Sequence, residues 1–167
     1  MLLFSPEILT IAADRGLPEQ WVPLCVAVGS AASAAGRLLC PAASDHWGRK
    51  PVLYGVYAAL AAGSIGFAFA QGWWVLAAYC VLTCFYSGGA AVQPALNTDL
   101  FGLAHAGVNY GLIALGMSAG SLLSYAGSQL LDLPARHMLA VASAVAGGIC
   151  FLFVKPVATV EKQQGNG

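Results

Sequence analysis

The chain has 167 residues, of which 59% are hydrophobic and only 8% are charged, and its seven basic and seven acidic residues cancel to a net charge of zero. So few charges exclude a nucleic-acid-binding protein, which needs a basic face to neutralise phosphates, and a soluble domain, which carries roughly 25% charged residues. The composition predicts an all-α polytopic protein embedded in a lipid bilayer.

Six apolar stretches follow one another along the chain. The first, residues 1–13, is too short to cross a bilayer, and we interpret it as the end of a helix whose start is missing. Five others approach the roughly 20 residues that a spanning helix needs, and they cover residues 21–43, 52–70, 73–95, 108–131 and 137–154. Loops are predicted at the polar residues of 45–48, 71–72, 97–99 and 132–134. The tail 156–167 is polar and is predicted to be disordered.

Basic residues near the predicted span ends indicate an orientation in the plasma (inner) membrane. If the 44–51 loop is cytoplasmic, two basic residues lie outside and four lie inside: Arg15 and Arg136 against Arg49, Lys50, Lys155 and Lys162. This bias has the sign of the positive-inside rule, so the C-terminus is predicted to be cytoplasmic.

Small residues recur at helical spacing within the spans. They are Gly29, Ser30 and Ser33 in the 21–43 span, and the Gly107/Gly111 and Gly116/Gly120 pairs at the 108–131 span. Such spacing lets helix backbones approach closely in lipid, so we expect tight packing there. The alternative is a smooth surface along which a helix slides against its neighbours.

No enzymatic chemistry is predicted. The five cysteines form no CxxC pair, and no His or carboxylate stands at metal-ligand spacing beside them. The sequence has no nucleophile elbow and no phosphate-binding loop. We expect neither an enzyme nor a bound cofactor or metal.

Arg37 is the one basic residue inside a predicted span. It precedes Asp45 by eight residues, which is about 12 Å along a helix. A charged side chain at such depth costs about 2.5–3.5 kcal/mol on insertion scales, so it needs a partner or a role. Two interpretations remain open: the side chain reaches back to the headgroups or to Asp45, or it binds an anion with its two-donor fork.

The segment "GRLLCPAASDHWGRK" resembles the signature of the major facilitator superfamily, with Asp45, Gly48, Arg49 and Lys50 as the matching residues. The segment beginning at Pro94, which contains "NYG" at 109–111, resembles the loop and eleventh helix of the oxalate/formate antiporter family. The resemblance implies that residues 1–155 are helices seven (partial) to twelve of a twelve-helix carrier. A separate N-terminal half of six helices would complete it.

The resemblance also implies a function, the transport of a small organic anion by alternating access. In that family a basic residue at the position of Arg37 engages the substrate carboxylate, and an aromatic residue at the position of Tyr86 helps to enclose the substrate. The alternative for Tyr86 is an ordinary buried residue near the centre of its helix. Ser33 lies one turn before Arg37 and is a further candidate, although it could bond to its own backbone instead. Where the antiporter prototype has a lysine this chain has Met117, which favours a monocarboxylate such as formate, lactate or pyruvate over oxalate.

The matching residues of the signature are predicted to form a gate rather than a binding site. Gly48 permits a tight turn, and the charges of Asp45, Arg49 and Lys50 could pair with neighbouring helix ends in one conformation and release them in the other. For Arg49 and Lys50, orientation in the membrane is the alternative role. A carrier of another organic anion or drug, and a non-transporting membrane subunit or fragment, are the alternative functions.

Overall fold

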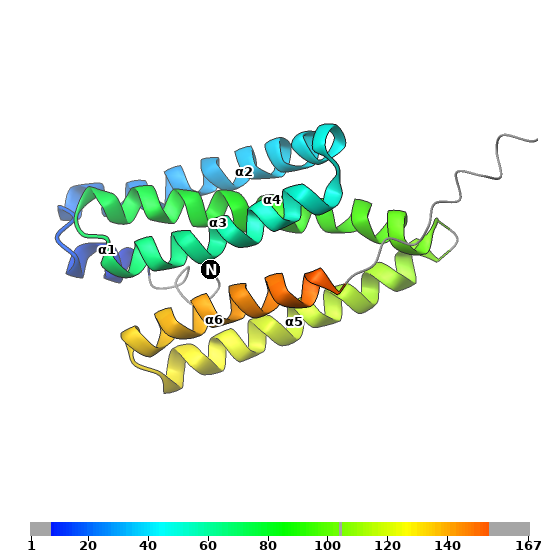
Figure 1. The fold of residues 1–167 in the computed structure, drawn as a ribbon. Helices are drawn as coiled ribbons and strands as arrows, with labels where there is room; N and C mark the ends of the chain where they lie inside the picture. The colour runs from blue at the N-terminus through cyan, green and yellow to red at the C-terminus, as the bar shows by residue number, and fades with distance from the viewer. Residues whose placement is uncertain (1–7, 104, 154–167) are drawn as a thin grey trace, which may run out of the picture.

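The computed structural model describes residues 8–103 and 105–153, and these residues form helices and their connections without a strand (Figure 1). The predicted all-α fold is confirmed. Residues 1–7 of the predicted partial helix, the tail 156–167, Lys155 and Lys162 lie outside the described residues.

Within the described residues, six α-helices and one short 3-10 helix follow in chain order. They are α1 (Ile8–Asp14), η2 (Glu19–Trp21), α2 (Val22–Trp47), α3 (Arg49–Phe69), α4 (Trp73–Phe101), α5 (Ala106–Leu130) and α6 (Leu133–Leu152). Among the described residues, four of these helices, α2 to α5, are long and apolar enough to cross a bilayer. In α6 the apolar stretch Met138–Leu152 is shorter.

The helices run further than the polar residues of the sequence predict. The prediction of a loop at 97–99 is wrong, because α4 continues to Phe101 and is followed by Gly102, whose φ is +76°. The Thr98 hydroxyl donates to the Ala95 carbonyl at 2.8 Å, so this polar residue is satisfied within the helix. In the same way α2 continues through residues 45–47 and ends at Gly48 (φ +92°), with the Ser44 hydroxyl donating to the Pro41 carbonyl at 2.8 Å.

The α6 helix also begins earlier than the predicted loop at 132–134 allows. Pro134 lies in the first turn of α6, where a residue without an N–H group leaves no helical hydrogen bond unmade. Asp132 is the residue that precedes the helix. The proline therefore starts this helix instead of separating two spans.

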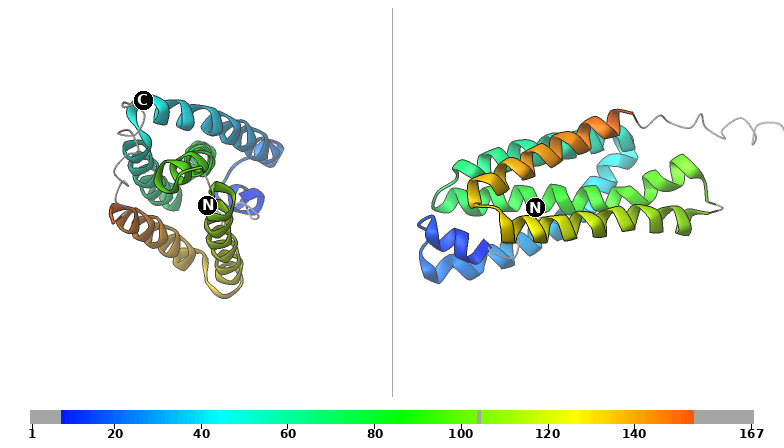
Figure 2. Two further views of the ribbon diagram at one scale, coloured as in Figure 1. Left: turned by 90° about the vertical axis from the view of Figure 1, so that its right-hand side faces the viewer. Right: turned by 90° about the horizontal axis from the view of Figure 1, so that it is seen from below.

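Helix α4 is central in the bundle and packs against α2 and α3, as the end-on view in Figure 2 shows. The closest approach is between α2 and α4 at two glycines. A Cβ on Gly36 would lie 2.7 Å from the carbonyl carbon of Cys84, and one on Gly88 would lie 2.8 Å from Cβ of Cys40. Both distances are shorter than real contacts, so α2 and α4 touch backbone to backbone at Gly36 and backbone to side chain at Gly88.

The glycine pairs of α5 do not pack in this way, which corrects the sequence-based expectation. A Cβ added at Gly107, Gly111, Gly116 or Gly120 would meet no atom of the described residues within 4 Å. No residue of α5 whose burial is described is buried. The spacing of small residues indicates that another helix can approach closely, but it does not identify that helix.

The end of the bundle that carries the α3–α4 connection is held by Arg15. Its guanidinium group donates hydrogen bonds to the carbonyls of Phe67 and Ala70, the latter at 3.3 Å, and stacks 5.1 Å above the Phe67 ring. In return, the Gly72 amide donates to the Arg15 carbonyl at 2.9 Å. These contacts fasten the α1–α2 connection to the α3–α4 connection over a cluster of buried apolar residues.

Candidate functional site

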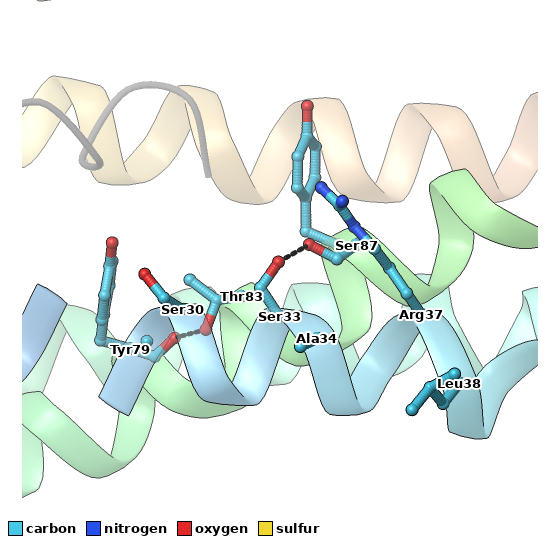
Figure 3. Close-up of a pocket in the computed structure, with 10 residues that line it drawn as sticks. Ser30, Ser33, Ala34, Arg37, Leu38, Tyr79, Thr83 and Ser87 are labelled. Atoms are coloured by element: carbon cyan, nitrogen blue, oxygen red, sulfur yellow. Dashed lines mark hydrogen bonds between the residues drawn. The ribbon is translucent and has the colours of Figure 1, made fainter. Parts of the chain in front are cut away.

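A cavity of about 560 Å³ opens between α2 and α4, on the side of α2 that carries Arg37 (Figure 3). Its lining residues are small, hydroxylated or aromatic apart from Leu38 and the single charged residue Arg37. They are Gly29, Ser30, Ser33, Ala34, Arg37 and Leu38 from α2, and Tyr79, Thr83, Tyr86 and Ser87 from α4. All three predicted substrate-binding residues, Ser33, Arg37 and Tyr86, line this one cavity.

The α2 side of the cavity follows from helix periodicity. Residues Ser33 and Arg37 are four apart, so they lie one above the other on the same face. Figure 3 shows the Arg37 side chain rising on the side of α2 where Ser33 meets Ser87, while Leu38 points away. Arg37 is exposed in the cavity, and within residues 8–103 and 105–153 its guanidinium group has no hydrogen bond or ion pair.

The α4 side of the cavity contains residues that the sequence did not single out. Thr83 and Ser87 follow Tyr79 at intervals of four, which places all three on one face of α4. The Thr83 hydroxyl donates to the carbonyls of Tyr79 and Cys80 at 2.9 and 3.0 Å, so its proton is used within the helix. The interval of four is the only sequence signal for this wall, and it does not by itself say which helix α4 faces.

The two hydroxyls of Ser33 and Ser87 form the direct bond between the walls. Their oxygens lie 2.5 Å apart, and either can be the donor. Two hydroxyl groups carry two protons, and one bond between them uses one. The other proton remains available to an acceptor in the cavity. Ser33 therefore bonds across the interface, which corrects the expectation that it bonds to its own backbone.

The second group of predicted residues lies at the α2–α3 connection. Arg49, the first residue of α3, forms an ion pair with Asp45, donates from Nη1 to the Ser44 hydroxyl at 2.9 Å, and donates from Nε to Asp99 Oδ2 at 3.0 Å. The Arg49 contacts thus join the ends of α2, α3 and α4. Asp99 was missed, because the sequence placed it in a loop of its own.

The neighbours of Arg49 complete the connection. Gly48 has a φ of +92°, a conformation that side chains disfavour, and it reverses the chain between α2 and α3 in a single residue. Lys50 follows as the second residue of α3 and is half-buried. Because Asp45 pairs with Arg49, the alternative in which Arg37 pairs with Asp45 does not occur in this structure. Within the described part of the chain, no cluster of His, Cys, Asp or Glu could hold a metal ion.

One family model, the Major Facilitator Superfamily, matches residues 1–166, nearly the whole chain. The chain belongs to this superfamily. Its members are membrane transporters and not enzymes, so the chain is a multi-pass membrane protein of a transporter family. No curated protein and no solved structure matches the chain. The narrower resemblance to oxalate/formate antiporters stays a prediction.

Proposed function

We propose that the chain forms half of a secondary active transporter for a small organic anion, a monocarboxylate such as formate, lactate or pyruvate, moved by alternating access. The observation that carries this proposal is Arg37, whose guanidinium group is exposed in a cavity between two spanning helices and has no partner among the described residues. A charge at this depth is unfavourable unless it is compensated. A carboxylate compensates it and matches the planar two-donor fork.

The number of charges in the cavity supports a substrate with one carboxylate group rather than two. Among the residues that the structure describes, Arg37 is the only charged one that lines it. Met117, at the position where the resemblance would place a second cation, lines a neighbouring cavity without contributing a charge. A dicarboxylate would leave its second carboxylate unpaired on this half of the carrier, which is costly away from water.

The neighbours of Arg37 supply polarity and shape. The remaining proton of the Ser33–Ser87 pair supports a hydrogen bond to one carboxylate oxygen. Tyr86 is half-buried and supports enclosure of the substrate from the α4 side. Ser33, Arg37 and Tyr86 are accordingly the substrate-binding residues of this proposal.

We propose Asp45, Gly48, Arg49 and Lys50 as the gate, and add Asp99 to it. The Arg49 side chain bridges Asp45 and Asp99, so it holds three helix ends together in this conformation. Release of these contacts would let the helix ends separate, as alternating access requires. We place this end and the C-terminus on the cytoplasmic side of the plasma membrane, with Arg15 and Arg136 on the other side.

This mechanism requires a second six-helix half, because one half alone encloses the substrate on one side only. The burial of α5 is consistent with such a partner: none of its residues with described burial is buried, although α5 is apolar along its length. A helix face without protein contacts meets either lipid or another part of the carrier. We propose that part of the α5 surface and the open side of the Arg37 cavity face the partner half.

The test is uptake of labelled formate and lactate by the complete carrier in liposomes. Arg37→Gln should abolish uptake, Arg37→Lys should retain a part of it because the charge remains without the fork, and Arg136→Gln, at the opposite end of the bundle, should not matter. Unchanged uptake with Arg37→Gln would refute the proposal. Competition by another organic anion or a cationic drug in place of the monocarboxylates would favour the broader carrier, and absence of any uptake would favour a non-transporting subunit.

A further inference from the structure

A second cavity, of about 420 Å³, lies between α3, α4, α5 and α6. Tyr86 lines this cavity as well as the Arg37 cavity, so this residue lies at the boundary of the two. The lining is mostly apolar, and it includes no charged residue from the described part of the chain. Its polar members are Gln93 on α4, Ser143 on α6, and four further hydroxyl groups, those of Tyr57, Ser64, Tyr86 and Ser124.

Three groups on the walls of the second cavity are hydrogen-bond acceptors. The Gln93 Oε1 atom is buried and receives no hydrogen bond from any described residue. The Ser143 hydroxyl spends its proton on the carbonyls of Leu139 and Ala140, at 2.8 and 3.0 Å, and retains its lone pairs. Pro94 has no N–H group, so the Ala90 carbonyl on the cavity wall does not receive the regular helical bond.

Acceptors without charges select a particular kind of ligand. A carboxylate would meet hydroxyl groups but no cation among the described lining residues, and an ammonium group would be buried there without a counter-charge. Both arrangements are unfavourable. A neutral hydroxyl or N–H group, by contrast, would satisfy a buried acceptor whose unpaired state is costly. The apolar remainder of the lining fits a hydrocarbon body.

The position of Gln93 relates this cavity to the first. Tyr86 and Gln93 are seven residues apart on α4, which is two turns, so they share a face and stand about 10 Å apart along the axis. A molecule held at Arg37 by its carboxylate would pass Tyr86 before it reached Gln93. We propose that the second cavity extends the substrate site, and that the substrate is a monocarboxylate with an apolar body and a terminal hydroxyl or N–H donor for Gln93. This inference rests on the proposed function of Arg37.

The test is equilibrium binding of two acids of equal length to the purified complete carrier in lipid nanodiscs, with ω-hydroxyoctanoate as the probe, octanoate as its matched control and lactate as a short reference. The carrier should bind ω-hydroxyoctanoate about three- to tenfold more tightly than octanoate, the factor of one additional hydrogen bond. Gln93→Leu should remove this preference and leave lactate binding unchanged. Gln129→Leu, an exposed glutamine of α5, is the matched control and should preserve the preference.

The outcomes separate the two proposals. Two outcomes would show that the second cavity is not part of the substrate site. In the first, Gln93→Leu keeps the preference for ω-hydroxyoctanoate over octanoate, as it would if only water bonded to Oε1. In the second, Gln93→Leu weakens the binding of lactate as much as that of ω-hydroxyoctanoate. Gln93→Asn keeps the amide group but shortens the side chain, so its acceptor oxygen lies further from the ligand. This variant should reduce the preference, and it replaces the leucine variant in the test if that variant does not fold. If Arg37→Gln leaves all three acids bound while Gln93→Leu removes the preference, the carboxylate anchor is refuted and the donor site stands alone.

Discussion

Replacement of Gly36 by alanine tests the contact on which the Arg37 cavity is built. The added Cβ would lie 2.7 Å from the Cys84 carbonyl carbon and closer still to its oxygen, whereas carbon atoms prefer about 3.5 Å or more. Helix α2 would have to move at least about 0.8 Å away from α4 to relieve the carbon contact, and further to relieve the oxygen contact, since the obstacle is backbone and cannot rotate aside. Overpacking of this kind costs about 1–3 kcal/mol, and we expect the upper end.

The same substitution also brings a gain, because alanine is about 1 kcal/mol more favourable than glycine inside a helix. The expected net loss of stability for Gly36→Ala is therefore about 2 kcal/mol. Gly111→Ala is the matched control, since its Cβ meets no atom within 4 Å, and it should be neutral or stabilising.

The assay is thermal unfolding in detergent, followed by the reaction of a thiol-specific dye. Cys25 and Cys40 are 0% and 7% exposed and lie on α2 before and after Gly36, so they become reactive when α2 separates from α4. Gly36→Ala should lower the transition temperature and speed the reaction of both thiols. A Gly36→Ala protein as stable as Gly111→Ala would show that the close contact of α2 and α4 is wrong.

Two further predictions concern the two ends of the bundle. Asp99→Asn should cost less than about 1 kcal/mol in thermal stability, because its ion pair with Arg49 is partly exposed to solvent. The substitution should nevertheless increase the separation of labels placed on the ends of α3 and α4. Asp132→Asn, at the opposite end of the bundle, should leave that separation unchanged. Arg15→Gln should cost about 1–3 kcal/mol, because it removes charge-assisted hydrogen bonds to the Phe67 and Ala70 carbonyls; a thermal transition unchanged from that of the unaltered chain would contradict the role of Arg15.

The sequence predicts the helices well and their ends poorly. Long apolar runs leave no alternative to helices in a bilayer, because every backbone group must be satisfied within the segment. The ends depend on tertiary partners. Asp99 looks like a loop residue in isolation, yet it extends α4 because Arg49 from another helix pairs with it.

Of the candidate site, the sequence predicts one wall. Ser33 and Arg37 share a face by their spacing alone, whereas the approach of Thr83 and Ser87 depends on the register between α2 and α4. That register is set by Gly36 and Gly88, and their role is visible only once the facing backbone is known. The glycines of α5 have equally suggestive spacing and no neighbour. The acceptor at Gln93 is likewise defined by its surroundings rather than by a motif.

The two ends of the bundle differ in how salt should affect them. At one end, Arg15 donates to backbone carbonyls over a buried apolar cluster, and dissolved ions screen such partly buried contacts much less than exposed ones. At the other end, the side chains of Arg49, Asp99 and Asp45 are 27%, 52% and 67% exposed. Exposed charges lose much of their attraction as the screening length falls from about 10 Å at 0.1 M to 3 Å at 1 M salt. Rising ionic strength should therefore loosen the bundle from one end only, with the Arg15 end as the fixed point about which the helices spread.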